Sequence, residues 1–230
     1  MDELADGVFQ LRGFPPNAIN VYLAEGVMID ASSRGSAKRI IAQLEEHELR
    51  AHALTHAHPD HQGSSHAVCE ARGIPLWCGE GDADAMASGD LQSLLPENES
   101  TRKYMKVMGG PPHPVARRLR EGDDCGGGFV ALATPGHSPG HMAFWRERDR
   151  VLILGDVLVN MDIVTGELGL DEPPVHLTPD IPTNRDSARR LALLDPELVC
   201  FGHGPPLRDP ALFREFIAGL PVDAAAPSAS

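Results

Sequence analysis

The sequence gathers histidine and aspartate side chains into short stretches that could hold metal ions. The densest stretch is Thr55-His56-Ala57-His58-Pro59-Asp60-His61, which places four potential ligands within six residues. Residues two apart on extended backbone point to the same side, so His56 and His58 could share one ion. A turn at the proline could then present Asp60 and His61 to a second ion. Neutral imidazole and carboxylate suit zinc, and also iron or manganese.

Three more candidate ligands follow short apolar runs elsewhere in the chain. They are His137 in Thr134-Pro135-Gly136-His137, Asp156 after Leu152-Ile153-Leu154-Gly155, and His203 in Phe201-Gly202-His203-Gly204. Glycines permit tight turns around a ligand, and a buried acid at a strand end needs a partner that a metal ion can provide. A solvated histidine-rich loop could explain one such stretch. Four together favour a metal centre. His141, four residues after His137 in a turn-rich segment, is not included among the ligands.

The elements that must position these side chains are indicated by apolar runs between glycine and proline signals. Strands are expected at 8–11, 18–24, 27–29, 51–55, 75–78, 129–133, 142–146, 151–154 and 198–201. Helices are expected at 36–49, 64–72, 184–194 with Asn184 as N-cap, and 210–220. Residues 157–182 have the composition of a loop.

The segment 80–114 is a long connection with its own helix-compatible stretches at 82–87 and 100–108. Such a segment is typical of a lid or substrate loop, although a surface excursion has the same signature. Tyr104 in this segment and His176 in the loop after Asp156 are candidate substrate contacts. Helix packing is the other interpretation of Tyr104.

The four ligand-bearing stretches, in this order, resemble the motifs of the metallo-β-lactamase superfamily of hydrolases, from about Val8 to Leu207. The resemblance implies an α/β fold, a four-layer αβ/βα sandwich with two divalent metal ions at one edge between its sheets. It implies a first ion on His56, His58 and His137, and a second on Asp60, His61 and His203, with Asp156 bridging both. Zinc is the favoured metal, with iron or manganese as alternatives.

The resemblance also implies hydrolysis by a metal-bridging hydroxide. Two close cations lower the pKa of a shared water, and one of them polarises the substrate oxygen. Asp60 is a candidate to handle a proton during turnover.

Composition narrows the substrate and the partners. The chain has 230 residues, enough for one domain at 1–220 followed by a disordered tail at 221–230. Its formal net charge of −13 argues against nucleic acid and anionic membranes as partners and favours a small-molecule substrate. Four dispersed cysteines and an acidic N-terminus without a signal-peptide stretch indicate reduced thiols and a cytoplasmic protein. The sequence leaves open whether the protein forms a homodimer.

Glyoxalase II relatives share the first stretch but carry a helical C-terminal domain that grips glutathione, and this chain ends soon after His203. A small hydrolase for an ester, thioester or lactone is therefore expected. The alternatives are a mononuclear iron persulfide dioxygenase, a phosphodiesterase or β-lactam hydrolase, and a non-catalytic metal-binding module.

Overall fold

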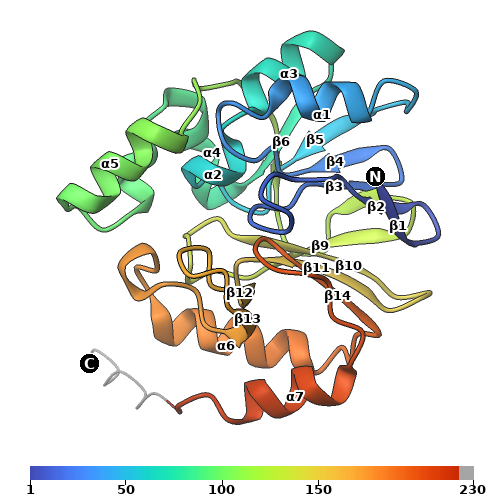
Figure 1. Ribbon diagram of the computed structural model, residues 1–230, viewed down its shortest axis with the longest axis vertical. Helices are drawn as coiled ribbons and strands as arrows, with labels where there is room; N and C mark the ends of the chain where they lie inside the picture. The colour runs from blue at the N-terminus through green and yellow to red at the C-terminus, as the bar shows by residue number, and fades with distance from the viewer. Residues whose placement is uncertain (223–230) are drawn as a thin grey trace.

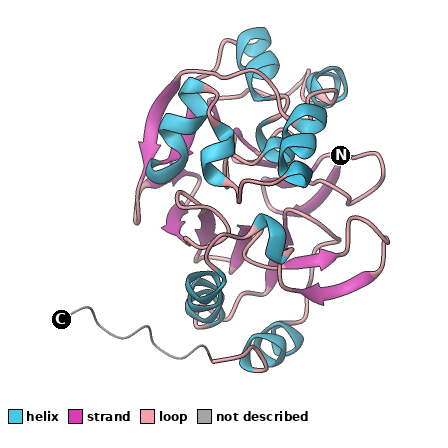
Figure 2. Cartoon of the chain, turned by 90° about the vertical axis from the view of Figure 1, so that its left-hand side faces the viewer, coloured by secondary structure: helices cyan, strands magenta, loops and turns pink. Residues whose placement is uncertain are grey.

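Two β-sheets face each other in the centre of the molecule, and helices cover both outer faces (Figure 1). The computed structural model describes residues 1–222. Figure 2 shows the two C-terminal helices nearly end-on beneath the strands, with the other helices above them. This arrangement confirms the α/β fold, a four-layer αβ/βα sandwich.

The first sheet contains seven strands in chain order. β1 to β4 form an antiparallel meander, and β4 to β7 are parallel. Parallel neighbours need crossover connections, which here are helical. The strands are β1 (Asp2–Ala5), β2 (Val8–Gln10), β3 (Tyr22–Ala24), β4 (Val27–Ile29), β5 (Ala51–Ala53), β6 (Leu76–Gly79) and β7 (Val115–Leu119). The crossovers contain α1 (Ala37–Gln43), α2 (Pro59–Gln62), α3 (Ser65–Arg72), α4 (Glu80–Ser88), η1 (Leu91–Leu94) and α5 (Glu99–Met108).

The second sheet has the order β14-β11-β10-β9-β8. Its strands are β8 (Asp124–Gly126), β9 (Phe129–Ala133), β10 (Met142–Arg146), β11 (Val151–Gly155) and β14 (Leu198–Phe201). β14 is parallel to β11, and the connection between them contains a hairpin and a helix. The remaining elements are β12 (Val159–Met161), β13 (Leu168–Asp171), η2 (Val175–Leu177), α6 (Ile181–Ala192) and α7 (Pro210–Ala218).

Alternation along β10 explains how one strand serves two apolar layers. Phe144 points into the core between the sheets, together with Ile29 and Ile153. Its neighbour Trp145 points to the opposite face, where α6 and α7 pack. A strand covered on both faces reads as a continuous apolar run, which is why its sequence shows no polar alternation.

Several expected boundaries are wrong for identifiable reasons. The helix expected at Asn184 begins at Ile181, and Asp180 is its N-cap, accepting a hydrogen bond from Thr183 N at 3.0 Å. In the sequence, Pro182 suggests that a helix cannot include this position, but a proline is compatible with the first turn of a helix. Asn184 is instead buried, and its Nδ2 donates to Val157 O at 2.9 Å.

The segment expected to be mostly loop, 157–182, contains the β12–β13 hairpin and the 3₁₀ turn η2. These elements are too short and, in β13, too exposed to produce an apolar pattern. The edge strands β1, β7 and β8 were not expected, because their sequences are largely polar. The strand expected at 18–24 is confined to Tyr22–Ala24, and the helix expected at 36–49 ends at Gln43.

All four cysteines are buried free thiols. Within residues 1–222, no helix has the length and apolarity needed to cross a membrane. Most of the tail expected to be disordered, residues 223–230, lies outside the described residues.

Candidate metal centre

The four ligand-bearing stretches meet at one edge of the sandwich, between the two sheets. The chain reaches this edge after β5, after β9, at the end of β11 and after β14, so strands from both sheets deliver the candidate ligands. None of the seven residues is more than 4% exposed: His56, His58, Asp60, His61, His137, Asp156 and His203. Asp60 and His61 do not lie in an open turn, because Pro59 begins the short helix α2 that carries both.

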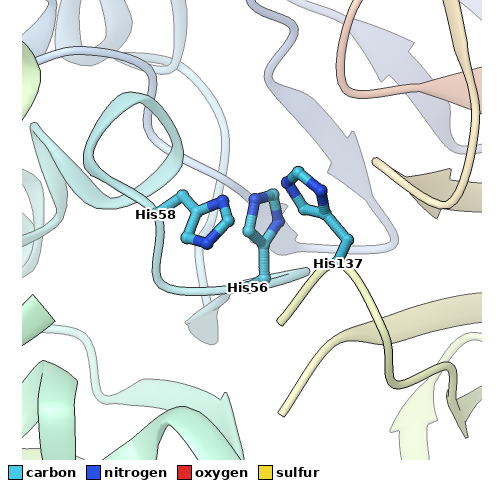
Figure 3. A group of neighbouring side chains, drawn as sticks. All are labelled: His56, His58 and His137. Atoms are coloured by element: carbon cyan, nitrogen blue, oxygen red, sulfur yellow. The ribbon is translucent and has the colours of Figure 1, made fainter. Parts of the chain in front are cut away.

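His56, His58 and His137 form the first group of candidate ligands (Figure 3). Their potential ligand atoms lie within 4.8 Å of one another. The Nε2 atoms of His56 and His58 are buried and have no hydrogen-bond partner within residues 1–222. Buried nitrogens without a partner are costly, and a cation between the three rings would remove that cost. This group therefore fits a bound metal ion.

Asp60, His61 and His203 form the second group. One carboxylate oxygen of Asp60 lies 3.7 Å from His61 Nε2, and the other lies 3.3 Å from His203 Nε2. The two imidazole Nε2 atoms are 3.4 Å apart. Two imidazoles and a carboxylate directed at one point suit zinc, iron or manganese.

Asp156 lies between the two groups. Its Oδ2 is 3.6 Å from His137 Nε2 in the first group and 3.0 Å from His203 Nε2 in the second. Its Oδ1 is buried without a hydrogen-bond partner in the described chain. One carboxylate that faces both groups has the placement required of a bridging ligand.

Hydrogen bonds on the outer side of the rings set which nitrogen carries the proton. Thr55 Oγ1 donates its one proton to Asp30 at 2.8 Å. It also lies 3.0 Å from His56 Nδ1, and it must therefore accept a hydrogen bond from that nitrogen. Thr178 Oγ1 donates to Pro174 O and accepts from His137 Nδ1, each at 3.0 Å. Each ring therefore holds its proton on Nδ1 and leaves the Nε2 lone pair for a metal ion.

The second group is held in the same way. His61 Nδ1 donates to Asp30 at 2.9 Å, and His203 Nδ1 donates to the carbonyl of Ala18. Asp30 was missed in the sequence, although it directly follows the strand that ends at Ile29. A buried acid at a strand end is the signal that identified Asp156, and it could have found Asp30.

Asp82 of α4 joins two of the ligand-bearing loops. Its carboxylate accepts hydrogen bonds from Ala57 N at 3.0 Å, Ser138 Oγ at 2.7 Å and Gly140 N at 2.6 Å. No sequence signal marks it, because α4 shows no pattern that distinguishes a buried aspartate from an exposed one.

His141, which is not among the candidate ligands, supports the centre from beside it. Its Nε2 accepts from the backbone N of Asp156 at 3.1 Å, and its Nδ1 lies 2.7 Å from Thr134 Oγ1. Both ring nitrogens are thus occupied away from the two groups.

The protein's own charges divide the centre into a neutral side and a charged side. Burial, together with the neighbouring imidazoles, lowers the pKa of His56 and His137 well below the usual value. Burial lowers the pKa of His58 to about 4. Burial also opposes the charged form of His203, but Asp156 and Asp60 raise its pKa to about 9. The carboxylates therefore attract positive charge, which a bound cation would supply.

The centre opens into a cavity of about 210 Å³ that contains both candidate substrate contacts. Tyr104 of α5 donates a hydrogen bond from its phenol to Asp60 Oδ1. Burial and the nearby Asp60 carboxylate raise the pKa of Tyr104 well above its usual value, so the phenol keeps its proton. His176 of η2 also lines the cavity. The segment 80–114 thus contributes to the cavity through α5, which packs beside α2.

A family model for the metallo-β-lactamase superfamily matches residues 14–203. The chain belongs to this superfamily, whose members are mostly metal-dependent hydrolases, and the His/Asp cluster is its metal-binding centre.

Three relatives illustrate the range of the superfamily. A probable metallo-hydrolase, YflN of Bacillus subtilis, is 27% identical and covers 89% of this chain and 86% of its own length. The hydroxyacylglutathione hydrolase GloC of Haemophilus influenzae is 30% identical over 74% of this chain and 76% of its own. The crystal structure of TTHA1623 in a di-iron-bound form is 31% identical, with a TM-score of 0.63 over 86% of this chain and 92% of that one.

Proposed function

We propose that this protein is a dinuclear metal-dependent hydrolase that acts on an uncharged ester, thioester or lactone. The observation that carries the proposal is Asp156, whose carboxylate faces two complete groups of candidate ligands at the floor of a cavity. A non-catalytic metal-binding module would not require such a cavity beside the ligands.

The ligand sets follow the geometry. His56, His58 and His137 would hold one ion, and Asp60, His61 and His203 the other, with Asp156 shared between them. When bound, the two ions would supply a hydroxide nucleophile near neutral pH and polarise the substrate oxygen. Zinc is our first choice, and the di-iron-bound relative supports iron as the alternative.

Tyr104 and Asp60 are the groups of this chain that we assign to proton handling. The Tyr104 phenol retains its proton and lines the cavity. Its single O–H points to Asp60 in this structure, and on turning toward the substrate it would donate a hydrogen bond to the developing oxyanion or the leaving oxygen. Asp60, which accepts the phenol hydrogen bond, can receive a proton from the nucleophile.

The cavity wall supports an apolar, uncharged substrate. Val159, Met161 and Leu177 line it, and Ile163 and Val164 extend from the β12–β13 hairpin at its rim. Such a wall would accommodate an aliphatic chain.

The charged groups at the rim are carboxylates. Asp162 and Asp171 are exposed there, whereas Glu172 is paired with Arg185 at 2.7 Å. Among residues 1–222, those lining the cavity include no lysine or arginine. An anionic substrate such as a glutathione thioester would meet repulsion at this rim.

Hydroxyacylglutathione hydrolysis is nonetheless the second candidate, because the relative from Haemophilus influenzae bears that name. The test is a comparison of aliphatic lactones and neutral thioesters with S-lactoylglutathione, using enzyme reconstituted with zinc or iron. We expect kcat/KM for the best neutral substrate to exceed that for the glutathione thioester at least tenfold. The reverse order would favour the second candidate.

Three further outcomes would replace the proposal. A single bound iron ion per chain, with oxygen consumption on glutathione persulfide and no hydrolysis, would identify a dioxygenase. Turnover confined to phosphodiesters or β-lactams would assign the site to those substrates. Metal content of two ions per chain with no turnover on any member of the panel would favour a binding module.

A further inference from the structure

A second group of potential metal ligands lies on α3, outside the metal centre. It consists of His66 and Glu70, four residues apart on that helix, and His113, which precedes β7. Positions four apart lie on the same face of a helix, so both α3 side chains point toward the same neighbour. The potential ligand atoms of the three residues lie within 4.8 Å of one another.

The separations suit a metal ion. His66 Nδ1 lies 3.3 Å from His113 Nδ1, and His113 Nδ1 lies 3.9 Å from Glu70 Oε1. Two nitrogens bound tetrahedrally to zinc at about 2.0–2.1 Å would be about 3.3 Å apart. A hydrogen bond between the rings would account for the two histidines, but not for the carboxylate directed at the same place.

The surroundings suit an ion with one open position. The His113 side chain is 11% exposed and that of Glu70 is 66% exposed, so the group is partly buried on the imidazole side and open to water at the carboxylate. Burial, and then the neighbouring His66, lowers the pKa of His113. The ring is therefore neutral near pH 7, which is the form that binds metal.

We propose that His66, Glu70 and His113 bind one divalent transition-metal ion, preferentially zinc, separately from the metal centre. This inference does not depend on the proposed hydrolase activity. Two imidazoles, one carboxylate and a water molecule complete a tetrahedral set that zinc commonly adopts.

The ion would link α3 to the segment that follows α5. Arg34 N donates to Met108 O at 2.9 Å, and His113 N donates to Met86 O at 3.3 Å. The ion would add a side-chain link to these backbone hydrogen bonds. A metal ion at His113 would therefore stabilise the C-terminal attachment of α5, the helix that contributes Tyr104 to the cavity wall.

The experiment counts zinc ions bound per full-length chain by equilibrium dialysis and metal analysis, for the wild type, His113→Ala, Glu70→Gln and the control His47→Ala. His47 lies outside the metal centre and the α3 group, with its ring tilted against that of Phe9 at a centroid distance of 5.7 Å. We expect His113→Ala to bind one ion fewer than the wild type and the control. Glu70→Gln, at an exposed position, should bind that ion at least about tenfold more weakly.

Equal zinc counts and affinities in the wild type and both variants, with circular dichroism showing that all are folded, would overturn the proposal. If His113→Ala does not fold, Glu70→Gln decides alone. Asp156→Asn provides the distinction from the metal centre, because it should lose ions there and keep the ion on α3.

Discussion

At the scale of single residues, the centre depends on groups that hold the outer nitrogens of its histidines. Thr178 Oγ1 accepts a hydrogen bond from His137 Nδ1 and donates one to Pro174 O. Asp30 accepts a hydrogen bond from His61 directly, and it positions His56 through the hydroxyl of Thr55. Such partners orient a ligand ring and raise its basicity.

Thr178→Val should therefore weaken binding at the first ion about 10- to 100-fold, because the His137 proton loses its acceptor. Thr178→Ser keeps the hydroxyl and should stay close to the wild type. Competition with a chromophoric chelator measures both affinities. Equal affinities for the valine and serine variants would show that the hydroxyl does not support the ligand.

Tyr104→Phe removes the phenol hydroxyl and keeps the aromatic ring. We expect kcat on the best neutral substrate to fall about 100-fold, the scale of losing one oxyanion donor, while two metal ions remain bound. Unchanged kcat would leave Tyr104 as a packing residue of α5 and remove it from the proposed mechanism.

At the scale of elements, β5 is held to its neighbours by a buried histidine. His52 Nδ1 donates to Met28 O at 3.1 Å, and its Nε2 accepts from Ser65 Oγ at 2.8 Å, so the ring joins β4, β5 and α3. β5 leads directly into the first ligand stretch, so its position affects the metal centre. Burial lowers the pKa of His52 to about 4.

This shift predicts a pH dependence of stability. The unfolded chain takes up the His52 proton near pH 6.5 and the folded chain only near pH 4, so the unfolding free energy falls as the pH drops through this window. The contribution is complete above about pH 6.5 and amounts to roughly 3 kcal/mol. Urea unfolding of the metal-free protein at several pH values should show a steeper slope for the wild type than for His52→Gln. Parallel slopes would contradict the assignment.

The β12–β13 hairpin is the element that gives the cavity its selectivity in our proposal. Asp171→Lys should raise kcat/KM for an anionic thioester severalfold and leave a neutral lactone nearly unchanged, since only the former feels the rim charge. Asp171→Asn provides the intermediate case. An equal effect on both substrates would point to a change in the hairpin itself.

At the scale of the whole molecule, the formal charge of −13 adds to the local effect of the rim. Repulsion between like charges is screened by salt, with a Debye length of about 10 Å at 0.1 M. The kcat/KM for S-lactoylglutathione should therefore rise as the salt concentration increases from 0.01 to about 0.15 M. The value for a neutral lactone measured in parallel should stay flat, and an equal response would exclude electrostatic selection.

Much of the candidate site and of the buried strands could be predicted from the sequence, because the patterns that indicate them are local. Four of the candidate ligands are neighbours in the chain: His56, His58, Asp60 and His61. The other three each follow a strand that is recognisable as an apolar run: His137, Asp156 and His203. Strand ends in a sandwich converge at an edge, so these residues could be expected to meet. The strands 129–133, 142–146 and 198–201 were predicted for the same reason, since buried strands are continuous apolar runs.

The tertiary structure alone decided the groups that act across long separations. Asp30 reaches His61, Asp82 bridges Ala57 and Gly140, and Thr178 reaches His137, each over at least 25 positions. The meeting of His113 with His66 depends likewise on how the chain returns from α5 to β7. No periodicity encodes such contacts, because a hydrogen-bonding side chain can be satisfied by any nearby group and its partner is fixed only when the layers pack.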